Sequence, residues 1–328
     1  MQSYKRLHGH YTVGWVCALP KEQTAAMAML DHRHPDLPKP STDNNAYTLG
    51  SIGKHMIVIA CLPKGQIGNN SAATVATRMV STFPAVRFCF MVGIGGGVSS
   101  KVRLGDVVVS TPTGQYPGVV QWDFGKAAGG GCFERVGALN NPPGFILTAL
   151  AKLESVHEME GSKMTGFLED LLHKWPRLAP KYLRSDSLED VLFKADYDHV
   201  EGKASDDTDE DEEDETCRFC DRAQTRKRKP RDMRIHYGLI ASGNQVVKDG
   251  TFRDDLNRSL GGKVLCIEME AAGLATSFPC LVIRGICDYA DSHKNKQWQE
   301  HAAAFAKELL GYIEPQEVEE QSVALPVR

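Results

Sequence analysis

Short apolar runs recur along most of the chain and alternate with stretches in which apolar residues have helical spacing. We expect the runs to form β-strands at Tyr11–Leu19, His55–Leu62, Val86–Val92, Asp106–Ser110, His236–Ala241, Val264–Glu268 and Cys280–Ile286. Helical spacing predicts two helices, through Ala72, Val75, Ala76, Met79, Val80 and Phe83 and through Trp298, Ala302, Phe305, Leu309 and Ile313. This alternation is typical of an α/β protein with a mixed or mostly parallel sheet covered by helices.

One segment, from about Ser155 to Arg234, breaks the alternation. It contains an amphipathic stretch, the acidic run SDDTDEDEEDE, a cysteine pair and the basic run RAQTRKRKPR. A block of like charge in a polar context is normally solvated and disordered. We therefore expect a catalytic domain over residues 11–313 with an insertion at about 155–235, a flexible acidic part at 205–215, and a tail or linker at 314–328.

Composition narrows the classes of protein. The 328 residues are 42% hydrophobic and 24% charged, which is ordinary for a globular domain. A net charge of -4 gives no overall basic field, so no nucleic-acid partner is expected. No apolar run approaches the roughly 20 residues that cross a bilayer, so no membrane partner is expected either. Most of the nine cysteines lie in apolar runs, which fits a reducing, cytoplasmic location.

Two segments near the strand ends carry candidate chemistry. Ala18-Leu19-Pro20-Lys21-Glu22 places a carboxylate just after the first strand, where an open α/β sheet has its ligand crevice. Glu22 has a plainer interpretation as an acid in the first turn of a helix. Met91-Val92 leads into the glycine cluster Gly93–Gly97, whose backbone N–H groups could approach phosphate, ribose or water, or simply form a tight turn.

Two further segments lie at the ends of later strands. Glu268 and Glu270 are two residues apart, and Glu270 is expected in the turn to the next helix, where it could accept both hydroxyls of a ribose or serve only as a helix N-terminal acid. Arg284 and Asp288 place opposite charges near the end of a buried strand. This arrangement is costly unless the charges are paired or functional.

The ordered motifs ALPKE, GIGGG, GLIASGNQVVKDG, IEMEAAG and VIRGICDYAD resemble the purine nucleoside and uridine phosphorylase superfamily. They are most similar to its branch of methylthioadenosine and adenosylhomocysteine nucleosidases, and to the nucleosidase-like domain at the N-terminus of many fungal immune-receptor-type proteins. The resemblance implies a three-layer α/β/α sandwich of nucleoside phosphorylase type with a mixed central sheet. It also implies a homo-oligomer in which a neighbouring subunit helps to complete the active site.

The resemblance also implies roles for single residues. Asp288 matches the aspartate that protonates or hydrogen-bonds purine N7, Glu270 the glutamate that holds the ribose hydroxyls, and Met269 the methionine packed against the sugar. Glu22 and Arg284 match the pair that positions the attacking water. The remaining matches are the loop beside the sugar, Gly93, Ile94, Gly95 and Gly96, and the stretch that covers the base, Asn244, Val246 and Val247.

These residues suit cleavage of a C1′–N9 bond. The bond leaves an oxocarbenium-like sugar and a purine anion, so an acid at N7 and a negative group near the ribose favour the transition state. Asp288 must then carry a proton, and we expect Arg284 to pair with Glu22 or with the water rather than with Asp288.

The predicted function is hydrolysis of the N-glycosidic bond of a purine, by resemblance adenine, nucleoside or nucleotide, with release of free base and ribose or ribose phosphate. Phosphorylases of the superfamily place arginines where this chain has Glu22 and Met91-Val92, which favours water as the nucleophile. No cofactor is expected for catalysis. The alternatives are a phosphate-dependent phosphorylase and a non-catalytic nucleotide-sensing module of an immune-type receptor.

The insertion carries a candidate metal site. Cys217 and Cys220 form a Cys-x-x-Cys pair, and with His199 they could hold a structural zinc ion, for which His236 is a candidate fourth ligand. The basic run at 226–229 could reach the phosphates of a nucleotide or offset the acidic run, and we favour the second interpretation.

Overall fold

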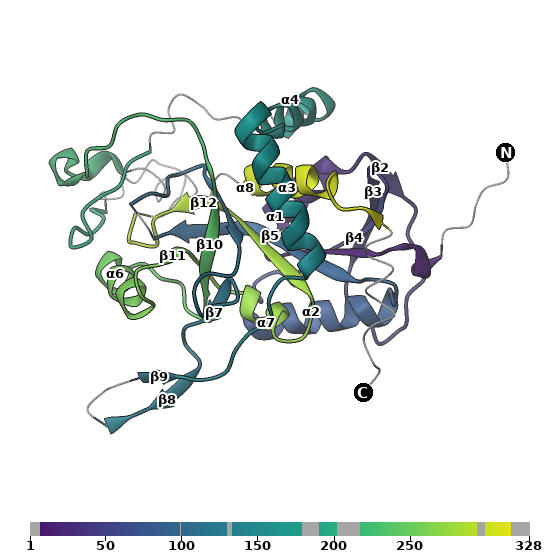
Figure 1. The fold of residues 1–328 in the computed structure, drawn as a ribbon, viewed down its shortest axis with the longest axis horizontal. Coiled ribbons are helices and arrows are strands. Elements are labelled where there is room, and N and C mark those ends of the chain that lie inside the picture. Colours follow the sequence, from purple (N-terminus) through teal and green to yellow (C-terminus); the bar gives the residue numbers. More distant parts are fainter. Residues whose placement is uncertain are drawn as a thin grey trace, which may run out of the picture.

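The protein is described by a computed structural model that covers residues 7–98, 100–129, 133–178, 190–201, 217–293 and 299–315 (Figure 1). The strands are β1 (Val13–Cys17), β2 (His32–His34), β3 (Tyr47–Ile52), β4 (His55–Cys61), β5 (Phe88–Gly97), β6 (Val107–Ser110), β7 (Val119–Gln121), β8 (Gly125–Ala127), β9 (Phe133–Arg135), β10 (Ile235–Ser242), β11 (Val264–Glu268) and β12 (Cys280–Asp288). The α-helices are α1 (Pro20–Met29), α2 (Asn69–Thr82), α3 (Gly144–Glu160), α4 (Met164–Lys174), α6 (Gly250–Ser259), α7 (Ala271–Ala275) and α8 (Gln299–Leu310).

The sheet is mixed, as the sequence predicts. Its order is β11-β10-β6-β12-β5-β1-β4-β3-β2, with β7 beside β10. The strand β12 lies between β5, to which it is parallel, and β6, to which it is antiparallel. Besides β10, β11 also pairs antiparallel with the last residues of β5, Cys266 opposite Gly97 and Ile267 opposite Gly96. This second pairing brings the ends of β5, β11 and β12 together.

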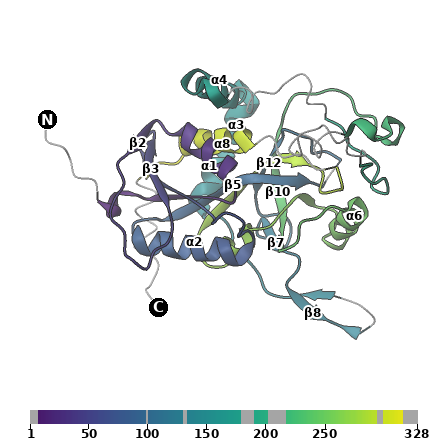
Figure 2. The same cartoon turned by 180° about the vertical axis from the view of Figure 1, so that it is seen from behind.

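Helices cover both faces of the sheet, which confirms the three-layer α/β/α architecture. Figures 1 and 2 show α1, α3, α4 and α8 on one face and α2 with α7 on the other. Successive side chains of a strand point to opposite faces of the sheet, so each face has its own hydrophobic core. Trp15 of β1 packs in the cluster with Phe305 of α8, whereas Val16 packs in the cluster with Met79 of α2.

All seven strands predicted from the apolar runs are present, and the helix predicted from Ala72 to Phe83 is α2. The part of the predicted insertion that forms α4 packs on the main core through Met164 and Leu171. The acidic run 205–215 and most of the predicted tail lie outside the described residues. Among the described helices, none combines the length and the apolar character that a membrane crossing demands.

Candidate active site

The centre of the candidate site is Arg284, which the central strand β12 carries into the interior with no exposed surface. Its guanidinium forms an ion pair with Glu268, lies 3.5 Å from Oε2 of Glu270 through Nη2, and donates from Nη1 to the carbonyl of Ile94 at 3.4 Å. A buried guanidinium is tolerated only when carboxylates and hydrogen bonds compensate its lost hydration. Burial lowers the pKa of Arg284, but the carboxylates of Glu268, Glu270 and Glu22 outweigh it and raise that pKa, so the charge is permanent.

Glu22 lies in the first turn of α1 and is 3% exposed. Its Oε2 accepts the backbone N–H groups of Ala18 and Leu19 at 2.7 and 3.0 Å, and its Oε1 accepts the N–H of Ile94 at 2.8 Å. Burial raises the pKa of Glu22, while Arg284 and the three N–H donors lower it. The carboxylate of Glu22 therefore caps its helix and also lies close to the arginine, while its role in positioning water stays a prediction.

Glu268 and Glu270 lie just before the start of α7. Glu268 accepts the N–H groups of Glu270 and Ala271 at 3.0 to 3.2 Å and so caps the helix that follows. Glu270 is 5% exposed, and its Oε1 accepts the N–H of Gly68 at 3.3 Å. Burial raises the pKa of Glu270 to about 7, with further increases from Glu268 and Glu22 and an opposing effect of Arg284. Half-buried Met269 lies between the two glutamates in the sequence.

Of the two partners expected for Arg284, Glu22 and the water, Glu22 does not form a direct ion pair with it in the described contacts. The short contact is with Glu268, and the next is with Glu270, whereas Glu22 acts on the arginine only as a nearby charge. The reason is the antiparallel pairing of β11 with the end of β5, which brings Glu268 close to Arg284 on β12. Asp288 does not pair with Arg284 in any described contact, as expected.

The glycine cluster is part of a strand, not the loop that the sequence predicts, because β5 extends to Gly97. Residues with a side chain would not fit at Gly93 and Gly95. A Cβ on Gly93 would lie 2.3 Å from Oε1 of Glu22 and 2.5 Å from Nη1 of Arg284, and a Cβ on Gly95 would lie 2.4 Å from Sγ of Cys266. Ile94 is half-buried between them and contributes the N–H and C=O that bind Glu22 and Arg284. The glycines thus make room for charged side chains.

Asp288 is the last residue of β12 and is 7% exposed. Its Oδ1 accepts the backbone N–H of Ala290 at 2.7 Å, which orients the carboxyl group. Ala290 has a φ of +50°, a strained value for a residue with a side chain. Gly96 lies directly beneath, since a Cβ there would be 2.9 Å from Oδ1 of Asp288 and 2.7 Å from Cβ of Ala290.

The stretch predicted to cover the base lies beside the N-terminus of α2. Asn244 accepts the N–H of Asn69 at 3.1 Å through Oδ1, and its own N–H and amide group donate to Asp123 at 2.7 and 3.1 Å. Val247 is buried, whereas Val246 is 53% exposed and turns away from the packed interior.

An aromatic ring lies next to this stretch. Trp122 packs against Gly243, where a Cβ would be 2.4 Å from Nε1 of the indole. That buried Nε1 has no hydrogen-bond partner among the described residues. Trp122 shares a hydrophobic cluster with Val247 and Ala290, so the cluster joins the base-covering stretch to the loop after Asp288.

Sequence reasoning missed several of these residues. Gly68 and Asn69 bind Glu270 and Asn244 from the start of α2, and Asp123 holds Asn244. The only signal for the first two is a glycine directly before a helical pattern. Nothing in the chain marks Asp123, because it lies in a polar stretch without periodicity.

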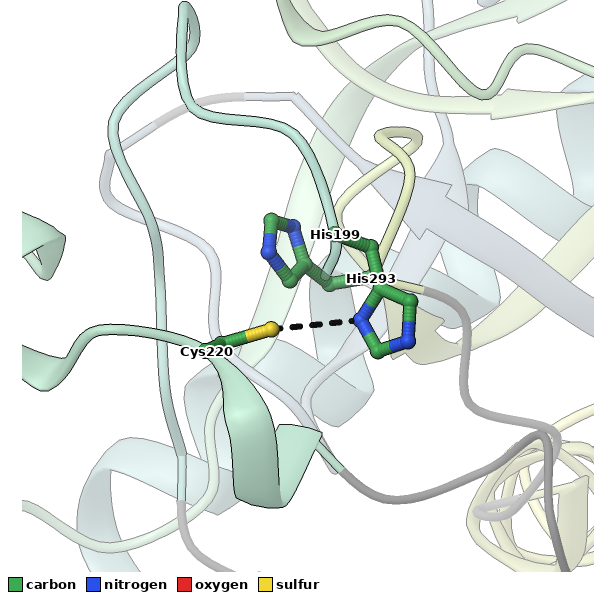
Figure 3. A group of neighbouring side chains, drawn as sticks. All are labelled: His199, Cys220 and His293. Atoms are coloured by element: carbon green, nitrogen blue, oxygen red, sulfur yellow. Dashed lines mark hydrogen bonds between the residues drawn. The ribbon is translucent and has the colours of Figure 1, made fainter. Parts of the chain in front are cut away.

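The predicted metal ligands are only partly brought together. His199 and Cys220 are neighbours, but the third member of their compact group is His293 rather than Cys217 (Figure 3). His236 is not near them, since its Nε2 lies 2.7 Å from Oδ2 of the buried Asp106. A zinc site that includes His236 is therefore wrong.

One residue of the basic run at 226–229 contacts the loop beside the candidate site. Arg228 donates to Oδ1 of Asp190 at 2.8 Å and to the hydroxyl of Tyr289, the residue that follows Asp288. Arg228 thus fastens the insertion to the loop after Asp288, whereas the role of the run as a counter-charge stays a prediction because the acidic run lies outside the described residues.

Taken together, the site places a buried arginine among three carboxylates, with the further carboxyl group of Asp288 at the end of the same strand. One positive charge faces three groups that can be negative, and one of these has a pKa near 7. Such a cluster repels an incoming anion, but it can bind and orient water and the hydroxyl groups of a sugar.

Comparison with known proteins finds similar sequences and similar folds. The sequence profile of the Phosphorylase superfamily matches residues 12–161, which ends close to the predicted start of the insertion. A "Nucleotide-binding leucine-rich repeat (NLR)-like protein" of Hyaloscypha variabilis is 45% identical over 319 residues. The match covers 93% of this chain but 30% of that protein, so the chain spans less than a third of the length of this relative.

Nucleosidases are also similar in sequence and in fold. The "5'-methylthioadenosine/S-adenosylhomocysteine nucleosidase" of Mycobacterium tuberculosis is 25% identical, with 91% of this chain and 95% of that protein covered. The solved structure of the Helicobacter pylori enzyme of the same name superimposes with a TM-score of 0.57 at 17% identity, over 92% of this chain and 99% of the other. Futalosine hydrolase of Helicobacter pylori gives 0.56 at 16% identity, over 93% and 98%. The fold is therefore that of the nucleoside phosphorylase type.

Proposed function

Because the chain resembles the nucleosidase branch of the phosphorylase superfamily, we propose that it hydrolyses the N-glycosidic bond of a purine nucleoside or nucleotide, with adenine as the favoured base. The products are the free base and ribose or ribose phosphate. The observation that supports hydrolysis most directly is the complete neutralisation of Arg284 by Glu268 and Glu270, with Glu22 close by.

In the proposed reaction Asp288 supplies the proton. Its carboxyl group is oriented by the N–H of Ala290 at the end of β12, at the strand edge where the base-covering stretch also lies. Donation to N7 of the purine offsets the negative charge that develops as C1′–N9 breaks. Side chains and water are sufficient for every step.

Glu270 accepts the ribose hydroxyls in this proposal, and Met269 packs against the sugar. A carboxylate near the sugar stabilises the positive charge that develops at C1′. Glu22 and Arg284 orient the attacking water between β5 and β12, where Gly93 leaves room for both side chains. Val247, together with Trp122 in the same apolar cluster, offers a surface for the flat base.

Phosphorolysis is the nearest alternative. A phosphate nucleophile needs cations that are not already paired, and Arg284 is held by carboxylates on the sugar side of the site. Lys21, which precedes Glu22, is exposed at the start of α1 and does not change this balance. Water is therefore the proposed nucleophile.

A second candidate function is a nucleotide-sensing module without turnover. It is favoured by the relative of Hyaloscypha variabilis, which is described as a nucleotide-binding leucine-rich repeat-like protein and is more than three times as long as the matched region. Binding of a purine nucleotide by the same residues would then transmit a signal instead of a product.

The test is release of free base from adenosine, inosine, guanosine, methylthioadenosine, AMP and ATP, each with and without phosphate. We expect release without phosphate from at least one adenine compound, and a loss of at least about 100-fold in kcat for Asp288→Asn. Release only with phosphate would establish a phosphorylase. Binding without release by wild type would support the sensing module.

The Asp288→Asn variant needs a check on folding, because Oδ1 also accepts the N–H of Ala290. The amide keeps an oxygen acceptor for that bond, so we expect the thermal midpoint to change by only a few degrees. A variant that loses activity and unfolds together would indicate a structural role for the aspartate.

We also propose that the protein is a homo-oligomer. The two-stranded unit of β8 and β9 extends away from the body of the molecule (Figure 1). It carries exposed Phe133 and follows exposed Phe124. The chain enters this arm directly after Asp123, which binds Asn244 of the candidate site, so a partner that packs on the arm would lie near the base.

A further inference from the structure

Three potential metal ligands from distant parts of the sequence meet beside the candidate active site (Figure 3). His199 and Cys220 belong to the predicted insertion, and His293 lies in the loop that follows Asp288. One ligand atom of each lies within 4.8 Å of those of the other two, and Sγ of Cys220 is 3.3 Å from Nδ1 of His199. Imidazole nitrogen and thiolate sulfur at such spacing are the donors that zinc prefers.

His293 is the member that most needs a ligand. Its side chain is 6% exposed, and neither ring nitrogen has a hydrogen-bond partner among the described residues. The ring is stacked on Phe193 with the centroids 4.0 Å apart and the planes 12° apart, so only its edges remain for polar contacts. A buried imidazole without partners loses its hydration with no hydrogen bond to replace it, which is unfavourable.

The surroundings supply the remaining parts of a metal site. Oδ1 of Asp291 is 3.6 Å from Nδ1 of His293, and a carboxylate at this position commonly orients a ligating imidazole. Cys217 lies in the same short turn as Cys220, where its carbonyl accepts the N–H of Cys220 at 3.2 Å. It is half-buried, and it forms with Cys220 the Cys-x-x-Cys spacing of zinc sites.

We propose that His199, Cys220 and His293 bind one structural zinc ion, with Cys217 as the fourth ligand. His293 binds through Nε2 and faces Asp291 with Nδ1. Cys217 lies outside the compact group of three, so its thiol moves towards the ion when the site is filled. The set is then two cysteines and two histidines, a closed tetrahedral arrangement without an open position for substrate.

The zinc site lies where the insertion meets the loop after Asp288, so a bound ion would connect these two segments. The loop after Asp288 is already fastened to the insertion at Tyr289 by Arg228, and the N–H of His199 donates to Oγ of Ser292 at 2.9 Å. A zinc ion bound to His293 would add a bond between the same two segments. The ion therefore acts through position: it fixes the strained loop that orients Asp288, and it takes no part in the reaction itself.

The first experiment is metal analysis of the full chain, purified without added metal or chelator. We expect about one zinc ion per chain in wild type and less than about a tenth of that in Cys220→Ser and His293→Ala. Matched controls are Cys61→Ser, a partly buried cysteine of β4, and His173→Ala, an exposed histidine of α4, which should both retain the ion. Equal zinc in all five proteins would overturn the assignment of the ligands.

A second experiment covers variants that fail to fold. Wild type is stripped by a chelator, reduced, and loaded with Co²⁺ in place of zinc. We expect intense thiolate-to-Co²⁺ absorption and the visible bands of a tetrahedral ion, weaker in Cys217→Ser. A wild type that contains no zinc and shows no such absorption rejects the site, as does a mass that reveals a Cys217–Cys220 disulfide in the freshly purified protein.

Discussion

The single positive charge of Arg284 faces three carboxyl groups, so the net charge of the site depends on which of them is protonated. Burial and the neighbouring glutamates raise the pKa of Glu270 to about 7, so this residue exchanges its proton close to neutral pH. The ionised form is the better acceptor for ribose hydroxyls and the better stabiliser of positive charge on the sugar. The protonated form relieves the repulsion from Glu268 and Glu22. Activity and stability therefore favour opposite states of Glu270.

This conflict predicts the behaviour of Glu270→Gln. In wild type we expect kcat/KM to rise with pH through about 7 as Glu270 ionises, and in the variant we expect that limb to be absent and kcat/KM to fall by at least about 100-fold. Initial rates from pH 5 to 9 on the substrate identified above will measure both. An unchanged limb in the variant would assign the titration to another group.

Glu270→Gln should also change how the free energy of unfolding depends on pH. The pKa of Glu270 is raised on folding, so its contribution to stability is fully present below its unfolded value and is lost as pH rises through about 7. Removal of the titrating group should therefore make Glu270→Gln more stable relative to wild type at pH 8.5 than at pH 5. Denaturant unfolding at both pH values measures the difference, with the exposed Glu160→Gln as the control.

At the residue scale the sequence identifies the charged groups but not their pairing. Glu22, Glu270, Arg284 and Asp288 each stand just after or within an apolar strand, and that position predicts a common sheet edge. The partner of Arg284 could not be predicted, because it depends on the pairing of Cys266 and Ile267 with the end of β5, a contact between distant parts of the chain.

At the scale of elements, long apolar runs are predicted well and short polar strands are not. The seven runs named from the sequence all form strands, since burial on both faces of a central sheet demands continuous apolar residues. The strands β2, β8 and β9 have mostly exposed residues and carry no such signal. The sequence predicts a loop or tight turn at Gly93–Gly97, because glycine permits backbone conformations that other residues avoid. It forms a strand because its neighbours β11 and β12 pair with it on both sides.

The glycine strand can be tested at Gly96, which lies under Asp288. In Gly96→Ala the new Cβ would be 2.7 Å from Cβ of Ala290 and 2.9 Å from its backbone N, so the loop must move. We expect a loss of about 1–3 kcal/mol in unfolding free energy and a fall of at least about 10-fold in kcat. Gly166→Ala is the control, because a Cβ there has open space within helix α4 and should leave kcat unchanged. Normal turnover in Gly96→Ala would show that the loop tolerates displacement.

In the molecule as a whole, the described parts of the predicted insertion hold the loop that follows Asp288. Residues 190–201 and 217–234 belong to the insertion predicted in the catalytic domain, and its acidic part at 205–215 lies outside the described residues. Asp190 and Arg228 contact Tyr289, and His199 contacts Ser292, in the loop after Asp288. Composition could not reveal this arrangement, because a charged residue in a solvated run and one in a buried network look alike in the sequence.

The arm formed by β8 and β9 bears on the oligomeric state of the protein. Two large apolar side chains, Phe124 and Phe133, are 56% and 52% exposed beside a segment that binds the candidate site. Aromatic side chains of this kind commonly anchor protein interfaces. We expect wild type to be a homo-oligomer and the double variant Phe124→Ser/Phe133→Ser to dissociate with a Kd at least about 100-fold higher, or about 3 kcal/mol.

Light scattering coupled to size exclusion over a range of concentrations measures the change in mass, and Met159→Ser, an exposed apolar residue on α3, is the control. If the partner subunit completes the active site, the specific activity of the double variant should fall on dilution while that of Met159→Ser stays constant. A monomeric wild type with concentration-independent activity would contradict the proposed oligomer. It would also leave the site that this chain builds around Arg284 and Asp288 sufficient for turnover.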